Sequence, residues 1–295
     1  MPASAADAPC PEQAFNATAL KWHTCAWLLL PVLIFLAGWM HWYAALPLML
    51  LTAAGLAPRK CKEPQTRDSL PAFPLFTRSS FLALAAFAAL MTLSGWGEWV
   101  NQHPDHIVRN ACLRELVASP WPVIFPDENM LVYNTGFWLI PALAGKLAGL
   151  DAARVLVVLW GAWGLFLAWL WLCVFSGRRS LLLALLMAAF GSLLNFQCWL
   201  GLDLFRLHYF GTAEQIMCSA NASIPVLLFF IFLASGRMPL PWIPLLFAAT
   251  AFYSPLAALG GLPLAACQWY RQWRGVPPLR DVLLHPSFSA SVPRL

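Results

Sequence analysis

Residues 155–175 read VLVVLWGAWGLFLAWLWLCVF, an unbroken apolar run without a charged side chain. A helix that crosses a bilayer needs roughly 20 predominantly apolar residues, within a range of about 17–25. This run therefore predicts a membrane-spanning helix. Two further runs, 81–97 and 181–198, reach the same range of lengths.

A longer apolar stretch at residues 25–57 is interrupted by His41, Trp42 and Pro47, which predicts a tight helical hairpin. Shorter or proline-interrupted apolar runs follow at 131–145, 222–235 and 241–267, and the last of these is broken at Ser254-Pro255. We expect an all-α polytopic membrane protein with about seven or eight transmembrane helices.

The composition excludes a soluble globular domain. Hydrophobic residues make up 60% and charged residues 11% of the 295-residue chain, against roughly 45–50% and about 25% in soluble domains. So few polar side chains cannot cover the outside of a water-soluble protein of this length. The formal net charge of +5 indicates attraction to the anionic headgroups of a lipid bilayer. Because no basic patch is interleaved with aromatic residues, we expect no nucleic-acid partner.

The distribution of Lys and Arg predicts the topology, because these residues are retained on the cytoplasmic side of a membrane. With a cytoplasmic amino terminus and no crossing by 131–148, only five of the 18 basic residues lie outside: Arg109, Arg114, Lys146, Arg154 and Arg206. A crossing by 131–148 would instead place the Arg178–Arg179 pair outside. We expect a multi-pass protein of a bacterial inner membrane with its amino terminus in the cytoplasm.

This topology divides the chain into three parts. Residues 1–80 comprise the cytoplasmic amino terminus, the hairpin at about 25–57 and a basic cytoplasmic linker, and residues 271–295 form a polar cytoplasmic tail. Residues 81–270 form the membrane core, with external loops at 98–153 and 199–221. These two loops hold most of the acidic residues, namely Glu98, Asp105, Glu115, Asp127, Glu128, Asp151, Asp203 and Glu214. Either the protein works on the external side, or the loops are simply where charge is solvated.

The first external loop predicts two helices that lie on the membrane surface. In 105–117, Val108, Cys112 and Leu116 share one apolar side, opposite a polar side with Asp105, His106, Arg109, Asn110 and Arg114. This is the pattern of an amphipathic interfacial helix, with Asp105 at its N-cap position. Pro120, Pro122 and Pro126 then form an extended connector, and 131–148 is a second apolar stretch that is short for a span.

Four ordered motifs carry a family resemblance: DHIVRNA at 105–111, PWPV at 120–123, LVY at 131–133 and PALAGK at 141–146. Together with Ala152-Ala153-Arg154 at the start of the next span, their order resembles the GT-C superfamily of integral membrane glycosyltransferases, over about residues 81–270. The resemblance implies a catalytic carboxylate on the first external loop and a sugar donor linked to a polyprenyl phosphate. The expected function is transfer of that sugar to an acceptor on the periplasmic face.

The chemistry assigns candidate residues within this framework. Sugar transfer needs a base for the acceptor hydroxyl, for which Asp105 is the first candidate and Glu98 the second. The leaving phosphate needs cationic and polar ligands, for which the candidates are Arg109, Asn110, Arg114, Lys146, His208 and Gln215. Each candidate has a structural alternative: Asp105 as a helix cap, Asp105 with Arg109 as an i,i+4 pair, and Lys146 as a side chain that reaches the headgroups.

Metal binding has no sequence signature in this chain. The eight cysteines show no CxxC motif and no His-paired metal spacing. We expect no cofactor, although a divalent metal stays possible for the transfer reaction. Cys112 and Cys218 both map outside and could form a disulfide in an oxidising compartment, but their spacing does not establish one.

Two other classes of function remain open. A carrier or flippase of lipid-linked saccharides is one, and a non-catalytic membrane subunit is the other. A carrier should place ionisable residues within its spans, whereas the runs 81–97, 155–175 and 181–198 hold none away from their ends. Members of the superfamily usually continue with more spans. We therefore expect a shortened enzyme, or one whose missing carboxy-terminal helices come from a partner chain.

Overall fold

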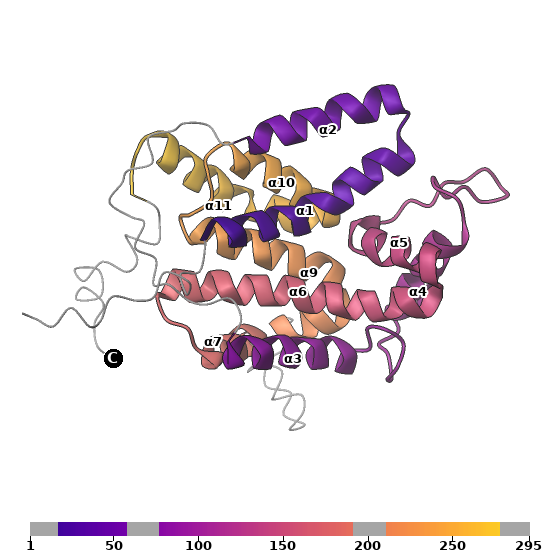
Figure 1. Cartoon of the computed structure of the whole chain (residues 1–295), viewed down its shortest axis with the longest axis horizontal. Helices are drawn as coiled ribbons and strands as arrows, with labels where there is room; N and C mark the ends of the chain where they lie inside the picture. Colours follow the sequence, from indigo (N-terminus) through magenta and orange to yellow (C-terminus); the bar gives the residue numbers. More distant parts are fainter. Residues whose placement is uncertain (1–16, 58–76, 191–210, 278–295) are drawn as a thin grey trace, which may run out of the picture.

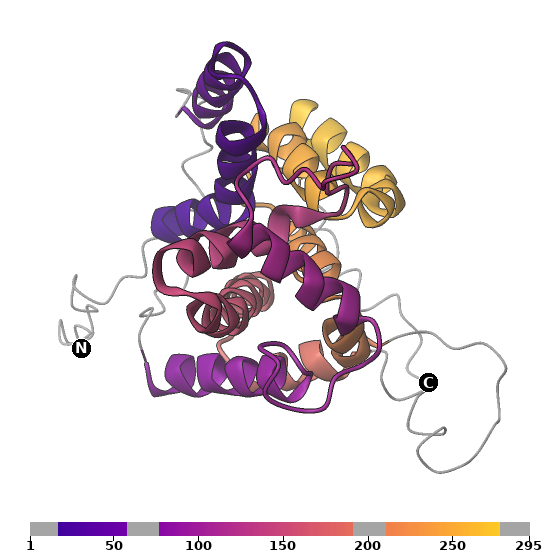
Figure 2. The ribbon, with the colours of Figure 1, turned by 90° about the vertical axis from the view of Figure 1, so that its right-hand side faces the viewer.

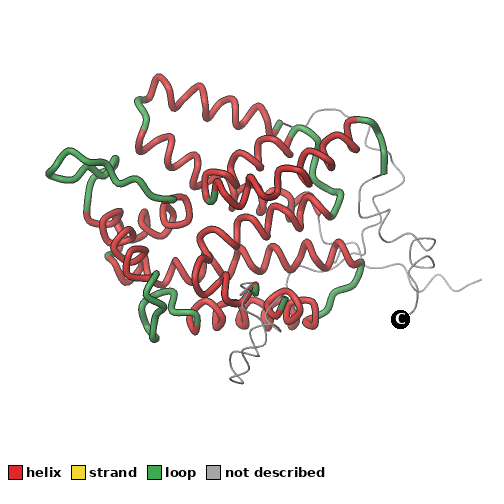
Figure 3. Tube along the Cα trace, turned by 180° about the vertical axis from the view of Figure 1, so that it is seen from behind, coloured by secondary structure: helices red, strands yellow, loops and turns green. Residues whose placement is uncertain are grey.

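The computed structural model describes residues 17–57, 77–190 and 211–277. Within these ranges the protein is all-helical, with no strand and only an isolated bridge between Ile124 and Met130 (Figure 3). The elements are α1 (Ala17–Trp39), α2 (Trp42–Leu56), α3 (Arg78–Leu93), α4 (His106–Ala118), the 3-10 helix η3 (Thr135–Trp138), α5 (Leu139–Ala148), α6 (Leu150–Ser176), α7 (Leu181–Ala189), α9 (Thr212–Ala234), α10 (Trp242–Tyr253) and α11 (Pro255–Trp273). The predicted all-α class is confirmed.

Three helices of the described residues are long and apolar enough to cross a membrane. They are α6, α9 and the Thr18–Trp39 part of α1, with 27, 23 and 22 residues. The helices α2, α3 and α10 are apolar but shorter. The run at 81–97, which was expected to form a span, forms most of α3, a helix of 16 residues. Of the run at 181–198, the structure describes only the first half, which forms α7. The fold is compatible with a membrane protein.

Both predicted breaks in the apolar stretches occur. The helix α1 ends at Trp39 and α2 begins at Trp42, so residues 25–57 form a helical hairpin (Figure 1). Pro47 lies inside α2 and does not interrupt it. The last apolar run breaks at Ser254, where α10 ends and α11 begins with a proline in its first turn. That position suits proline, because the first amide of a helix has no intrahelical acceptor.

The apolar segment 131–148 forms two short helices instead of a span. It consists of η3 and α5, and α5 has 10 residues. A helix of this length extends about 15 Å, which is half of a hydrocarbon core of about 30 Å. The segment packs against α4 and α6 at one end of the molecule (Figure 1).

The helix α6 is the centre of the bundle, and α1, α3, α5 and α9 pack around it. Two glycines allow the close contacts. A Cβ atom at Gly161 would overlap the Met91 side chain of α3, and one at Gly164 would lie 2.6 Å from Ile224 of α9. The interior is aromatic as well: the Trp27 ring stacks between Trp160 and Tyr253, at centroid distances of 5.0 and 5.7 Å.

Charged residues separate to the two ends of the bundle. The loop after α3, the helices α4 and α5, and the first turns of α6 and α9 meet at one end, here termed the acidic end, on the right in Figure 1. Every acidic residue of the described ranges lies in these segments or in the connector between α4 and η3: Glu98, Asp105, Glu115, Asp127, Glu128, Asp151 and Glu214. The opposite end carries Lys21, Arg78, Arg178, Arg179, Arg237, Arg271 and Arg274 in or beside helix termini, and is termed the basic end.

Between these ends, large apolar side chains face outward. Leu50, Leu51, Phe81, Leu185 and Leu256 are all exposed, as suits a surface that contacts lipid chains. Among the tryptophans, Trp22, Trp42, Trp99 and Trp269 are exposed, whereas Trp96 is buried in the core. Trp199 lies outside the described residues.

Candidate functional site

The acidic end, seen face on in Figure 2, holds the candidate site. Hydrogen bonds from three side chains connect the loop after α3 and the helix α4 to the first half of α9. Trp96 donates its indole N–H to the Ile216 carbonyl at 2.8 Å, and His106 Nε2 lies 2.9 Å from the Met217 carbonyl. Arg109 donates to Ser219 Oγ at 3.2 Å. Ser219 has non-helical dihedral angles (φ −153°, ψ 44°), so α9 is kinked where these contacts are made.

His106 is a neutral, buried link in this arrangement. Its carbonyl partner can only accept a hydrogen bond, so Nε2 carries the proton. Burial is the main cause that lowers the pKa of His106 below its ordinary value, which favours the uncharged ring. The prediction that His106 lies on the polar side of α4 is wrong, because this contact holds the ring inside, edge-on to Trp96.

Arg109 is the least expected member of the site, because it too belongs to the predicted polar side. Only 9% of its side chain is exposed, whereas Val108 of the predicted apolar side is exposed. Its guanidinium lies 5.9 Å from the Trp96 ring centre and 3.7 Å from Asp105 Oδ2. Within the described part of the chain, its Nε and Nη1 atoms are buried and have no hydrogen-bond partner.

Asp105 occupies the N-cap position of α4 but does not act as a cap. Its own backbone is helical (φ −59°, ψ −23°), and its side chain makes no capping hydrogen bond. The prediction of a capping carboxylate is therefore wrong, because a capping side chain needs an extended residue that turns back over the helix. The carboxylate is instead 52% exposed and faces His103 Nδ1 at 3.5 Å as well as Arg109. The predicted Asp105–Arg109 pair forms.

Glu98 is engaged more fully than Asp105. Its Oε2 accepts from Arg114 and from Arg154, both at 2.6 Å, and only 13% of its side chain is exposed. Arg154 also donates to Asp151 at 2.8 Å, so a second carboxylate holds its guanidinium in place. Glu98 has a left-handed backbone (φ 66°) and links the loop after α3 to α4 and α6. These bonds occupy Arg114 and leave Glu98 little freedom as a base.

The remaining sequence candidates make structural contacts. Asn110 donates to Gln102 at 2.7 Å, and Gln102 donates to the Gly95 carbonyl at 2.6 Å, which holds the loop after α3 in place. Lys146 donates to the carbonyls of Val117 and Ser119 at the end of α4 and lies over the Trp121 ring. Gln215 lies in the helix α9, not in a loop. His208 lies outside the described residues.

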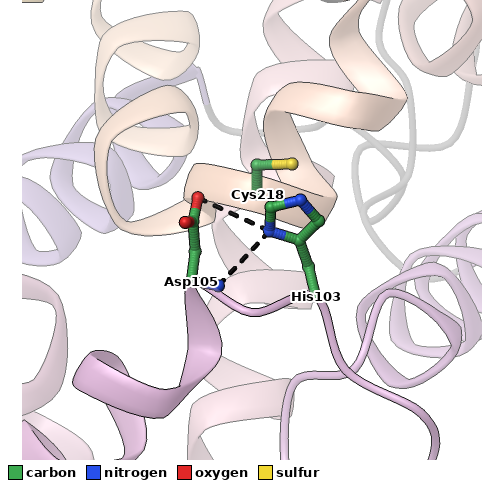
Figure 4. A group of neighbouring side chains, drawn as sticks. All are labelled: His103, Asp105 and Cys218. Atoms are coloured by element: carbon green, nitrogen blue, oxygen red, sulfur yellow. Dashed lines mark hydrogen bonds and ion pairs between the residues drawn. The ribbon is translucent and has the colours of Figure 1, made fainter.

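A further group at this end joins residues that are far apart in the sequence. His103, Asp105 and Cys218 present one potential ligand atom each, and these atoms all lie within 4.8 Å of one another (Figure 4). Cys218 comes from α9, more than a hundred positions after His103, so no spacing motif could reveal the group. Cys112 and Cys218 are both free thiols. Burial raises the pKa of Cys112 to about 12.

Comparison of the chain with protein-family models, with curated proteins and with solved structures finds no match in any of the three.

Proposed function

We propose that the protein is a membrane glycosyltransferase. It transfers a sugar from a polyprenyl-phosphate-linked donor to an acceptor on the periplasmic face of a bacterial inner membrane. The observation that carries the proposal is the buried guanidinium of Arg109, whose Nε and Nη1 donors have no hydrogen-bond partner within the described residues. A buried donor without a partner costs about 1–3 kcal/mol, and more for a charged group. Phosphate oxygens can accept hydrogen bonds from these donors, one along the Nε edge of the guanidinium and another at Nη1.

Asp105 supplies the second requirement of the reaction. Its carboxylate lies beside Arg109 and is half exposed, so an acceptor hydroxyl can reach it. When the hydroxyl oxygen attacks the anomeric carbon, its proton passes to Asp105. The bond to the lipid phosphate breaks, and Arg109 stabilises the negative charge on the departing phosphate. Glu98 acts indirectly. Its bonds to Arg114 of α4 and Arg154 of α6 hold in place the loop that leads to Asp105.

The proposed topology has about eight spans. They are α1, α2, α3, α6, α7, α9, α10 and α11, while α4 and α5 lie on the external membrane surface. With these helices as spans, the basic end faces the cytoplasm and the acidic end faces the periplasm. The concentration of Lys and Arg at one end and of all described carboxylates at the other supports this orientation.

A carrier of lipid-linked saccharides is the alternative, and the three long helices disfavour it. Their ionisable residues lie near one terminus of each helix: Lys21 and His23 in α1, Asp151 and Arg154 in α6, and Glu214 in α9. A carrier that binds its cargo at the middle of the membrane needs polar or ionisable groups there. The polar residues of this chain gather at one end, where an enzyme that takes its donor from the lipid phase needs them.

A transfer assay tests the proposal. Membranes that contain the full chain receive radiolabelled sugars on polyprenyl phosphates, and transfer to endogenous or added acceptors is measured. Asp105→Asn keeps the size of the side chain but cannot take the proton, so we expect transfer to fall by about 10²–10⁴-fold. Asp151→Asn is the matched control, since Asp151 is an exposed carboxylate at the same end. If Asp105→Asn transfers as fast as the parent, Asp105 is not the base. If no polyprenyl-phosphate sugar is a donor, the proposed function is wrong.

A further inference from the structure

His103, Asp105 and Cys218 converge on one point of the acidic end. Figure 4 shows the imidazole of His103 on the loop before α4 and the carboxylate of Asp105 at the start of that helix approaching each other, with the thiol above them on α9. His103 Nδ1 lies 3.5 Å from Asp105 Oδ2, and the three potential ligand atoms lie within 4.8 Å of one another. For a tetrahedral ion with ligand bonds of 2.0–2.3 Å, neighbouring ligand atoms are about 3.3–3.6 Å apart. The first pair already has this separation, and the sulfur lies within 4.8 Å of its two partners.

The position of Cys218 is fixed by its neighbours on both sides. The carbonyl of Met217 accepts from His106, and the hydroxyl of Ser219 accepts from Arg109. Both partners belong to α4, the helix that Asp105 precedes directly. The thiol is therefore held against the start of α4 by two hydrogen bonds that do not involve the thiol itself. Such outer contacts are what keep metal ligands in place.

The tautomer of His103 also suits a metal ligand. Its Nδ1 accepts the backbone N–H of Asp105 at 3.3 Å, so Nδ1 carries a lone pair and not a proton in this arrangement. This hydrogen bond is long and therefore weak, and the lone pair points toward the Asp105 side of the group. A metal ion can replace the N–H as the partner of that lone pair.

The three ligand types select the metal. A sulfur, an imidazole nitrogen and a carboxylate oxygen together suit Zn²⁺, whereas Mg²⁺ and Ca²⁺ prefer sets of oxygen ligands. Three protein ligands leave the fourth tetrahedral position open, as in zinc sites that bind a water or a substrate.

We propose that His103, Asp105 and Cys218 bind one Zn²⁺ ion, with the fourth position open beside Arg109. Metal binding does not depend on glycosyl transfer, although the two share Asp105. Oδ2 is the carboxylate oxygen that faces His103 and Arg109, so it is the atom of Asp105 that would bind the ion. An anionic group on the fourth position of the ion lies within reach of the Arg109 guanidinium, since Arg109 approaches the same Asp105 oxygen at 3.7 Å.

The test uses the purified full chain in detergent, freed of metal with a chelator and titrated with Zn²⁺ and with Co²⁺. Cobalt replaces zinc in such sites and reports a bound thiolate through a sulfur-to-metal charge-transfer band. We expect one ion per chain and a clear charge-transfer band for the parent. Cys218→Ser removes the band and weakens Zn²⁺ binding by at least about 10–100-fold, the range seen even when an outer contact of a ligand is lost. His103→Gln weakens binding to a similar extent and retains the band.

Cys267→Ser is the matched control, because Cys267 is an exposed free thiol on α11, and its titration should equal that of the parent. Each variant is checked for a single elution peak and the helical circular dichroism of the parent. If the parent binds no Co²⁺, or if Cys218→Ser keeps both the band and the affinity, the three side chains are only neighbours and do not form a metal site. The readout is independent of donor and acceptor, so a failed transfer assay leaves this result standing, and failed metal binding leaves the transfer result standing.

Discussion

At the scale of single residues, Arg109 is placed for binding at a cost in stability. Its guanidinium is buried, and its partners among the described residues are a hydroxyl, a half-exposed carboxylate and an aromatic ring. Replacement of a buried, imperfectly paired charge by an apolar side chain of similar volume is often neutral or stabilising. Arg109→Met should therefore leave the free energy of unfolding unchanged or raise it by about 1 kcal/mol.

The same variant should bind anions poorly. The probe is a short-chain polyprenyl phosphate in detergent, and we expect its affinity to fall by at least about tenfold, in line with the loss of a charge-assisted hydrogen bond. Arg178→Met at the basic end is the control for charge, because Arg178 is exposed and far from the site. A sharp drop in thermal stability for Arg109→Met, with the phosphate affinity retained, would make Arg109 a structural residue.

Glu98 should show the opposite behaviour to Asp105. Glu98→Gln keeps the shape of the side chain but removes the charge that receives Arg114 and Arg154. We expect the free energy of unfolding to fall by about 1–3 kcal/mol, and the protein that remains folded should still transfer sugar. Thermal unfolding in detergent and transfer per folded molecule measure the two effects. Glu115→Gln, which changes a carboxylate of α4 at the same end of the bundle, serves as control. A stable Glu98→Gln protein without activity would assign the base role to Glu98.

From the sequence it was possible to predict that two residues of the site lie together, but not their burial or their tertiary contacts. Asp105 and Arg109 do lie together, because an i,i+4 spacing in a helix brings them onto one side. Neither the burial of Arg109 nor the absence of capping by Asp105 follows from local sequence. Asp105 does not cap because its own backbone is helical, whereas the burial of Arg109 depends on Trp96 and Ser219, which reach α4 through the tertiary fold. Cys218 was missed for the same reason.

At the scale of elements, the adjacent glycines of α11 provide a matched pair. A Cβ atom at Gly260 would meet nothing within 4 Å, whereas one at Gly261 would overlap the Phe230 ring of α9. Alanine at either position favours the helix over glycine by about 1 kcal/mol. Gly260→Ala should thus be neutral or stabilising. Gly261→Ala should be less stable than Gly260→Ala by about 1–3 kcal/mol, because overpacking forces the ring to move.

Thermal unfolding of the two variants in the same detergent measures this difference. The comparison tests the packing of α11 on α9, because the substitution, the helix and the solvent are the same for both positions. Equal stabilities would show that α11 does not pack against Phe230 in the folded protein.

The elements also show what periodicity alone can predict. Apolar runs of span length were recognised from composition, and the breaks at Met40–His41 and at Ser254 were found where polar residues and proline interrupt them. The buried side of α4 was found only in part: Cys112 and Leu116 are buried as predicted, whereas Val108 is exposed. The apolar residues Ile107, Val108, Cys112, Leu113 and Leu116 spread around much of this short helix, so its sequence alone does not define one buried side. Tertiary contacts with α9 turn His106 and Arg109 inward and leave Ile107 and Val108 exposed.

At the scale of the whole molecule, the separation of charge to two ends predicts an orientation in the membrane, and two isosteric substitutions can test it. Val132 lies in the connector between α4 and η3 at the acidic end and is 90% exposed, while Val276 follows α11 at the basic end and is also exposed. Because Lys and Arg are retained in the cytoplasm, a membrane-impermeant maleimide should label Val132→Cys in intact cells and Val276→Cys only after permeabilisation. The parent chain, with its native thiols, sets the background for both, and labelled peptides are identified by mass. Labelling of Val276→Cys in intact cells, with protection of Val132→Cys, would show that the protein has the opposite orientation in the membrane. The acidic end would then face the cytoplasm, and both the site and its donor would have to be sought on that side.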